Sequence, residues 1–123
     1  MGFTSEPPNP LYALEGDDSS LEWNYTFGNE SFRQATFGKA KIPRMVDFLF
    51  FDSTPWIEPS NRGRLEVKIT NNFTVITLLG VRRTDSGIYH LTVTANPSRR
   101  SQTSKVEILV HCEYTTHESR CLE

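Results

Sequence analysis

The chain is poor in cysteine, and its two cysteines lie outside the body of the sequence. Cys112 and Cys121 both fall within the last twelve residues, so they exclude a disulfide between the strands of a core. A bond between them would close a ten-residue loop and stabilise that segment by roughly 2 to 3 kcal/mol through chain entropy. We predict this bond; the alternatives are pairing with cysteines of a following domain, free thiols and metal binding.

The sequence also lacks a long apolar run. No stretch approaches the roughly 18 apolar residues of a membrane-spanning helix, and the first residues lack the basic and apolar regions of a signal peptide. Met1-Gly2 and Leu122-Glu123 have the character of residues added by cloning. We therefore expect a signal peptide and an anchor to lie outside this sequence.

Positive charge is also scarce. The 13 basic and 15 acidic residues give a net charge of −2, and the pairs Arg82-Arg83 and Arg99-Arg100 are too isolated to form a basic field. We expect no nucleic-acid partner.

Catalytic motifs are missing as well. His90, His111 and His117 do not have metal-ligand spacing, and no serine or cysteine stands in a nucleophile motif. Cys112 and Cys121 join two of these histidines in a loose set, which we interpret as part of a linker. The sequence predicts no enzyme, no metal site and no cofactor.

What is present is alternation. Short segments of alternating apolar and polar residues are separated by Gly, Pro, Asn and Asp, which is typical of an all-β sandwich. A chain of 123 residues makes one domain that buries roughly 65 % of its unfolded surface. We predict an extended lead-in with cloning residues over 1–10, the domain over 11–110, and a tail over 111–123. The predicted strands include 11–14, 20–27, 31–37, 45–51, 64–69, 73–79 and 105–110.

The alternation also predicts which side chains face the core. In segment 31–37 it leaves a choice between Phe32 and the set of Ala35 and Phe37, and we favour the set. Segment 45–51 is apolar on both faces, so either the loop 52–60 with Trp56 covers one face or a partner does. The other inward residues are Leu21, Trp23, Tyr25, Leu65, Val67, Ile69, Ile76, Leu78, Val81, Tyr89, Leu91, Val93, Val106, Ile108 and Val110.

The most specific motif is Asp-x-Gly-x-Tyr at Asp85, Gly87 and Tyr89. Tyr89 would return its hydroxyl to upstream backbone, and Gly87 would relieve a crowded turn. Asp85 would pair with a cation on the strand at 64–69, for which we select Arg64. These residues are predicted to be structural.

This motif resembles the F strand of a V-set immunoglobulin-superfamily domain, and the resemblance extends from about Leu11 to Val110. It implies two antiparallel sheets packed as a sandwich. Leu91 and Trp23 stand at the two positions of the usual disulfide, so apolar packing would replace it, with each side chain worth roughly 1.5 to 3 kcal/mol when buried.

Loss of both cysteines is similar to the outermost domains of lymphocyte adhesion molecules and carcinoembryonic-antigen-type proteins. The Leu-x-Trp-x-Tyr strand and the Phe-rich strand after it resemble the membrane-distal domain of a cnidarian (colonial hydroid) allorecognition receptor. This implies an extracellular, membrane-anchored receptor that binds the same protein on an opposing cell.

Three glycosylation sequons agree with an extracellular protein. They begin at Asn24, Asn29 and Asn72, whereas Pro97 disqualifies the triplet at Asn96. In a V-set domain one of the two sheets is formed by strands G, F, C and C′ and is called the GFCC′ sheet. Asn24 would point outward from the other sheet, and the remaining two asparagines would lie in or beside loops. Glycans would therefore shield that sheet and leave the GFCC′ sheet bare.

In the family, the GFCC′ sheet is the recognition face, formed here by segments 31–37 and 45–51, the strand of Tyr89 and segment 105–110. Phe48 and Phe50 would be the desolvated anchors, and polar residues would fix the register of binding. The predicted partner-binding residues are Gln34, Thr36, Phe48, Phe50, His90, Thr92, Glu107 and Leu109.

Two other binding functions stay open. A heterophilic immunoglobulin-type partner cannot be distinguished from a homophilic one in the sequence. Sialic-acid-binding members of the superfamily use an arginine on the F strand, and the segment Ile88 to Val93 has none, so carbohydrate binding ranks lower.

Overall fold

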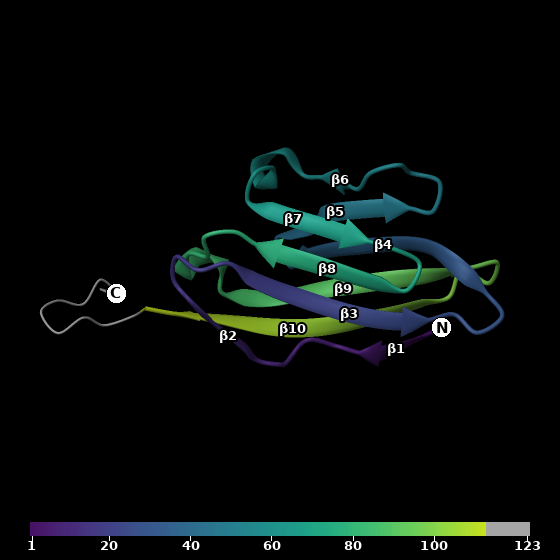
Figure 1. Ribbon diagram of the computed structural model, residues 1–123, viewed down its shortest axis with the longest axis horizontal. Helices are drawn as coiled ribbons and strands as arrows, with labels where there is room; N and C mark the ends of the chain where they lie inside the picture. The colour runs from purple at the N-terminus through teal and green to yellow at the C-terminus, as the bar shows by residue number, and fades with distance from the viewer. Residues whose placement is uncertain (113–123) are drawn as a thin grey trace, which may run out of the picture.

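Ten β-strands form over residues 1–112, the part of the chain described by the structure, which is a computed structural model. They make a four-stranded sheet in the order β1-β3-β8-β7 and a six-stranded sheet in the order β2-β10-β9-β4-β5-β6. In Figure 1 the first sheet lies in front of the second. The strands are β1 (Gly2–Ser5), β2 (Leu11–Leu14), β3 (Ser19–Thr26), β4 (Ser31–Lys39), β5 (Ile42–Leu49), β6 (Trp56–Ile57), β7 (Leu65–Ile69), β8 (Phe73–Leu78), β9 (Gly87–Asn96) and β10 (Ser101–His111).

The predicted all-β sandwich is thus confirmed, with one difference in strand direction. Residues Leu11–Leu14 of β2 run parallel to the end of β10, whereas every other pairing between these strands is antiparallel. The six-stranded sheet is therefore mixed. Two short 3₁₀ turns, Pro59–Asn61 and Arg83–Asp85, connect strands within the described residues.

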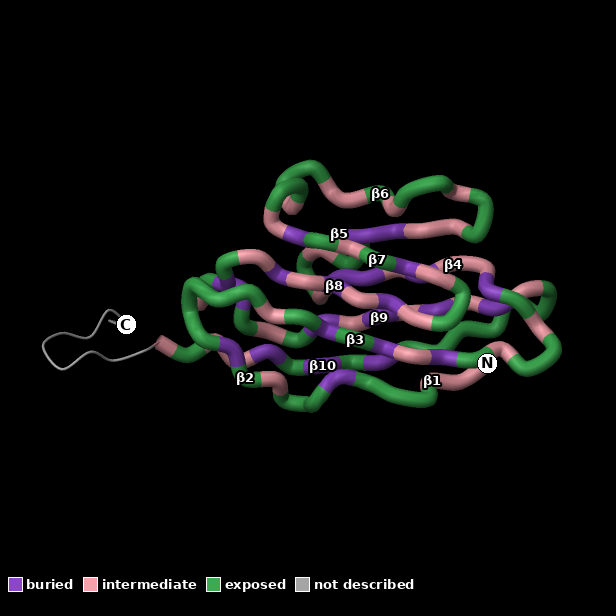
Figure 2. Tube along the Cα trace, in the orientation of Figure 1, coloured by how far each residue is buried: buried purple, intermediate pink, exposed green. Residues whose placement is uncertain are grey.

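The core lies between the two sheets and follows the alternation of the sequence. In Figure 2 buried segments alternate with exposed ones along β3 and β10 and with partly buried ones along β9. Trp23 on β3 and Leu91 on β9 are both 0 % exposed, as the sequence predicts. Each such side chain contributes roughly 1.5 to 3 kcal/mol when it leaves water.

Strand β4 resolves the choice that alternation left open. Phe32, Ala35 and Phe37 are all buried. The register of β4 against β9 shifts between Phe32 and Gln34, which is the geometry of a β-bulge. Because a bulge adds one residue to a strand, both candidate sets can face the core, and the exclusion of Phe32 was wrong.

The first ten residues do more than lead into the domain. Strand β1 pairs with β3, and Phe3 packs against the core. Asn9 then closes the edge of β10: its Oδ1 accepts from the Glu107 backbone N–H at 3.0 Å, and its Nδ2 donates to the Lys105 carbonyl at 3.4 Å. One side chain thereby replaces part of a neighbouring strand.

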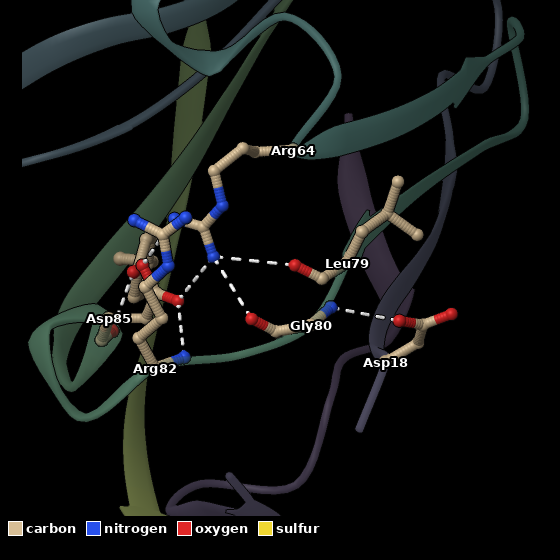
Figure 3. Close-up of polar contacts among 7 residues, drawn as sticks. Asp18, Arg64, Leu79, Gly80, Arg82 and Asp85 are labelled. Atoms are coloured by element: carbon tan, nitrogen blue, oxygen red, sulfur yellow. Dashed lines mark hydrogen bonds and ion pairs between the residues drawn. The ribbon is translucent and has the colours of Figure 1, made fainter. Parts of the chain in front are cut away.

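The turn before β9 is held by the Asp-x-Gly-x-Tyr motif. The Tyr89 hydroxyl donates to the Asp85 carbonyl at 2.6 Å. The Arg64 guanidinium binds both carboxylate oxygens of Asp85, at 3.3 Å and 2.9 Å, and also donates to the Leu79 and Gly80 carbonyls (Figure 3). These contacts connect the start of β7 and the end of β8, in one sheet, to the turn before β9, in the other.

This environment favours the charged form of Asp85. Burial of the carboxylate opposes ionisation, but hydrogen bonds from Arg64 and the Arg82 backbone, with the nearby charge of Arg64, outweigh it. The pKa of Asp85 is therefore lower than its ordinary value.

Candidate functional site

The six-stranded sheet has one side turned away from the core, which we call the outer face. It carries the side chains that alternate with buried ones along β4, β9 and β10. Six of the eight residues predicted to bind a partner lie there, on three adjacent strands. The outer face includes Gln34, Thr36, Asp47, Ile88, His90, Thr92, Lys105, Glu107 and Leu109.

The two predicted aromatic anchors are not on this face. Phe48 lies opposite Ala35, which faces the core, and its ring packs 5.9 Å from that of Phe32. Phe50 follows the end of β5 and lines a hollow of about 470 Å³ together with Phe48 and Phe32. The prediction that Phe48 points outward was wrong, because β5 pairs with β4 in the register that turns Val46 and Phe48 inward. Phe50 is 53 % exposed, but it lies beyond the end of β5 and not on the outer face.

That register instead places Asp47 on the outer face, where it organises a polar cluster. Its Oδ1 accepts hydrogen bonds from Gln34 Nε2 at 2.7 Å and from Thr36 Oγ1 at 3.2 Å. Its Oδ2 forms an ion pair with Arg44, with 2.9 Å from both Nε and Nη2. Asp47 is only 7 % exposed, so its charge is shielded and neutralised within the cluster.

Trp56 completes this cluster from the short strand β6. It pairs with Asp47 across the sheet, and the Arg44 guanidinium lies 4.5 Å from its ring centroid. The loop 52–60 therefore extends the sheet sideways by a strand. The sequence signal for the cluster was available: Asp47 is the one charge inside an apolar segment.

The centre of the outer face is polar but largely uncharged. His90 lies between Gly38 of β4 and Lys105 of β10, and among the described residues no hydrogen-bond partner reaches its buried Nδ1. Beside it, the hydroxyls of Thr92 and Thr103 bond each other at 2.8 Å.

One end of the outer face is apolar. Ile88 on β9 is 57 % exposed, and Tyr12 on β2 is 64 % exposed. Tyr12 lies opposite Leu109 on β10, so these side chains share the face. Sequence reasoning missed Tyr12 and Ile88, although alternation with the buried Ala13 and Tyr89 would have placed both outward.

The three sequon asparagines lie away from the outer face. Asn24 is on β3, where its amide donates to Ser5 Oγ at 2.7 Å, and Asn29 and Asn72 are exposed between strands. None of the six strands that form the outer face contains a sequon asparagine. A glycan attached to Asn24 would lie on the opposite sheet and leave the outer face accessible.

Other kinds of site have little support within residues 1–112. No group of three or more His, Cys, Asp or Glu residues there could hold a metal ion. The same part of the chain contains no helix that could span a membrane. The predicted Cys112–Cys121 bond and the linker set with His117 involve residues outside the described part of the chain.

Sequence comparisons leave the family open, since no protein-family model and no curated protein matches the chain. Structure comparisons identify the fold. Murine CRIg matches with a TM-score of 0.70 and 12 % identity over 93 % of this chain and 100 % of that chain. A chicken TCR matches with 0.68 and 10 % identity over 89 % and 50 % of the two chains. Titin domains Z1Z2 in complex with telethonin match with 0.66 and 21 % identity.

The chain therefore has an immunoglobulin-like fold. The titin match covers 91 % of this chain but only 48 % of the titin chain, which is about half of its length. The identities are low, so the likeness concerns the fold alone, and function must be argued from the outer face.

Proposed function

We propose that this chain is an extracellular recognition or adhesion domain of V-set type that binds another protein through the outer face. The V-set assignment is supported by two strands beyond a constant-type sandwich: β5 and the short β6 extend the sheet past β4.

The observation that carries the proposal is the contrast between the two sheets. The outer face has a polar centre with few charges, an exposed apolar end and a pre-organised Arg44 and Trp56 stack, and its strands carry no sequon asparagine. Arginine and tryptophan are enriched among residues that dominate binding energy. The opposite sheet carries Asn24 on β3.

The partner is proposed to be a second copy of the chain on an opposing cell, which would serve self and non-self recognition in a membrane-anchored receptor. A two-fold contact uses the same residues twice, so small allelic changes on the face would alter both halves of the interface. Heterophilic binding is the second candidate. Solved immunoglobulin-like neighbours include titin in complexes with telethonin and with obscurin-like 1.

The test is aggregation of beads that display the whole chain at high density. High density is needed because avidity can multiply a weak contact by roughly 10² to 10⁴. We expect wild-type beads to cluster, and Thr92→Arg on the outer face to abolish clustering. The matched control is Thr77→Arg on β8, because Thr77 also faces away from the core and also bonds a hydroxyl across the sheet, Ser20, at 2.8 Å.

Each outcome separates the candidates. Clustering that Thr92→Arg removes and Thr77→Arg preserves supports homophilic binding through the outer face. Equal loss in both variants would contradict the choice of face. Absence of wild-type clustering at every density would overturn homophilic binding and leave the heterophilic partner. Sorting of beads that carry a divergent allele would support allorecognition.

A further inference from the structure

We propose that Lys105 and Glu107 of one copy bind Glu107 and Lys105 of the second copy, so that this reciprocal pair fixes the register of homophilic binding. The inference rests on the proposed function and adds the residues that determine how the two copies align when they bind. It is derived from the charge arrangement on β10.

Lys105 and Glu107 stand two positions apart on β10 and alternate with the buried Ser104, Val106 and Ile108. Both side chains therefore project from the outer face, roughly 7 Å apart along the strand. Both are exposed, and within residues 1–112 neither side chain forms an ion pair. They are opposite charges on a recognition surface that no described residue neutralises.

A two-fold axis near Val106 would place each Lys105 opposite the Glu107 of the other copy. Rotation about such an axis exchanges the two positions, so both contacts form at once. The residues across β9 leave room for this contact: His90 lies opposite Lys105, and Ile88 lies opposite Glu107. Neither of these neighbours carries a fixed charge that would compete for the partner's side chains.

The contact must be made by side chains, because the backbone edge is closed at this point. Asn9 occupies the Glu107 N–H and the Lys105 carbonyl. A partner therefore cannot extend the sheet there by adding a strand. The face, and not the edge, is available to the second copy.

One neighbouring group argues for a different partner. Lys39 and Lys41 line a shallow hollow of about 550 Å³ with Ile88 and Glu107, so an acidic partner could be attracted to this end of the face. The two possibilities respond differently to charge reversal. An acidic partner loses affinity with Lys105→Glu and gains it with Glu107→Lys, whereas the reciprocal pair loses self-binding with either.

The experiment uses the same bead assay with the full chain. Lys105→Glu alone and Glu107→Lys alone should each reduce clustering by roughly tenfold or more, since each replaces two attractive contacts by two repulsive ones. Mixing the two populations should restore mixed clusters, because one variant then presents two glutamates and the other two lysines at these positions. The double variant Lys105→Glu with Glu107→Lys should cluster with itself.

The control places the same charge changes on the opposite sheet. Glu66 and Lys68 are exposed on β7 with the same spacing, so Lys68→Glu and Glu66→Lys should leave clustering unchanged. Circular dichroism on every variant confirms folding. Loss in the single variants without recovery on mixing would overturn the reciprocal pair while Thr92→Arg still tests the face. Unchanged clustering in the single variants would overturn it as well.

Wild-type beads that do not cluster would overturn both the pair and homophilic binding. Clustering that depends on Thr92 but not on Lys105 or Glu107 would overturn the pair alone. The two failures are therefore distinguishable in one set of measurements.

Discussion

The indole nitrogen of Trp23 donates a hydrogen bond to the hydroxyl of Ser104, with 3.0 Å between Nε1 and Oγ. Trp23 lies on β3 and Ser104 on β10, so the bond crosses from one sheet to the other. Ser104 also pairs with Leu91 across β9 and β10. Together these residues link the two sheets by apolar packing and one directional bond.

Removal of the acceptor should therefore destabilise the protein. Ser104→Ala is expected to lower the free energy of unfolding by about 1 to 3 kcal/mol, because the buried indole N–H loses its partner. Urea unfolding followed by circular dichroism measures the change. Ser101→Ala on the same strand is the control and should stay within about 0.5 kcal/mol, since Ser101 is exposed.

A double-mutant cycle isolates the bond. Trp23→Phe removes the donor, so the cost of Ser104→Ala should shrink in that background. An equal cost of Ser104→Ala in both backgrounds would show that the Trp23 bond is not the source of the effect.

The Arg64 and Asp85 pair should make stability depend on pH. The pKa of Asp85 is lower in the folded protein than its ordinary value of 3.8. Its contribution is therefore fully present above that value and is lost as the pH falls through the folded pKa. Urea unfolding from neutral to strongly acidic pH should show a loss at the acidic end that Asp85→Asn reduces.

The same substitution should cost about 1 to 3 kcal/mol at neutral pH, because Arg64 would keep a half-buried charge without its carboxylate. Asp52→Asn, another acid that accepts a backbone N–H, is the control for general acid effects. An unchanged acid limb in Asp85→Asn would contradict the assignment.

The inward position of Phe48 can be tested against its exposed neighbour. Phe48→Asp should lower the free energy of unfolding by about 2 to 3 kcal/mol, since it places a carboxylate against Phe32 and the core. Phe51→Asp should have little effect on stability, because Phe51 is 69 % exposed. Thermal or urea unfolding of both variants provides the comparison. Equal stability of the two variants would contradict the inward position of Phe48.

Much of the fold could be predicted because a sandwich strand has a period of two and one apolar side. This pattern located β2, β3, β7 and β10 within a few residues, and the Asp-x-Gly-x-Tyr motif located the turn before β9. It also predicted the Arg64 contact with Asp85, since a buried carboxylate needs a cation within reach. These features depend on local pattern and on one strong pairwise interaction.

The candidate site was less predictable, because the direction of a side chain in an apolar strand depends on register. Segment 45–51 is apolar on both faces, and only the pairing of Ala35 with Phe48 turns Phe48 inward and Asp47 outward. The Asp47 cluster then draws on β4, β5 and β6. No short window of sequence contains that set.

The sequence by itself determined an all-β chain with an apolar stripe on each strand, a tyrosine corner, and a core without a disulfide. Tertiary structure decided the bulge that buries Phe32 as well as Phe37, the acceptor for the Trp23 indole, and the closure of the β10 edge by Asn9. The physical reason is that alternation is a local property of the backbone. Register, bulges and hydrogen bonds between sheets arise only when distant segments meet.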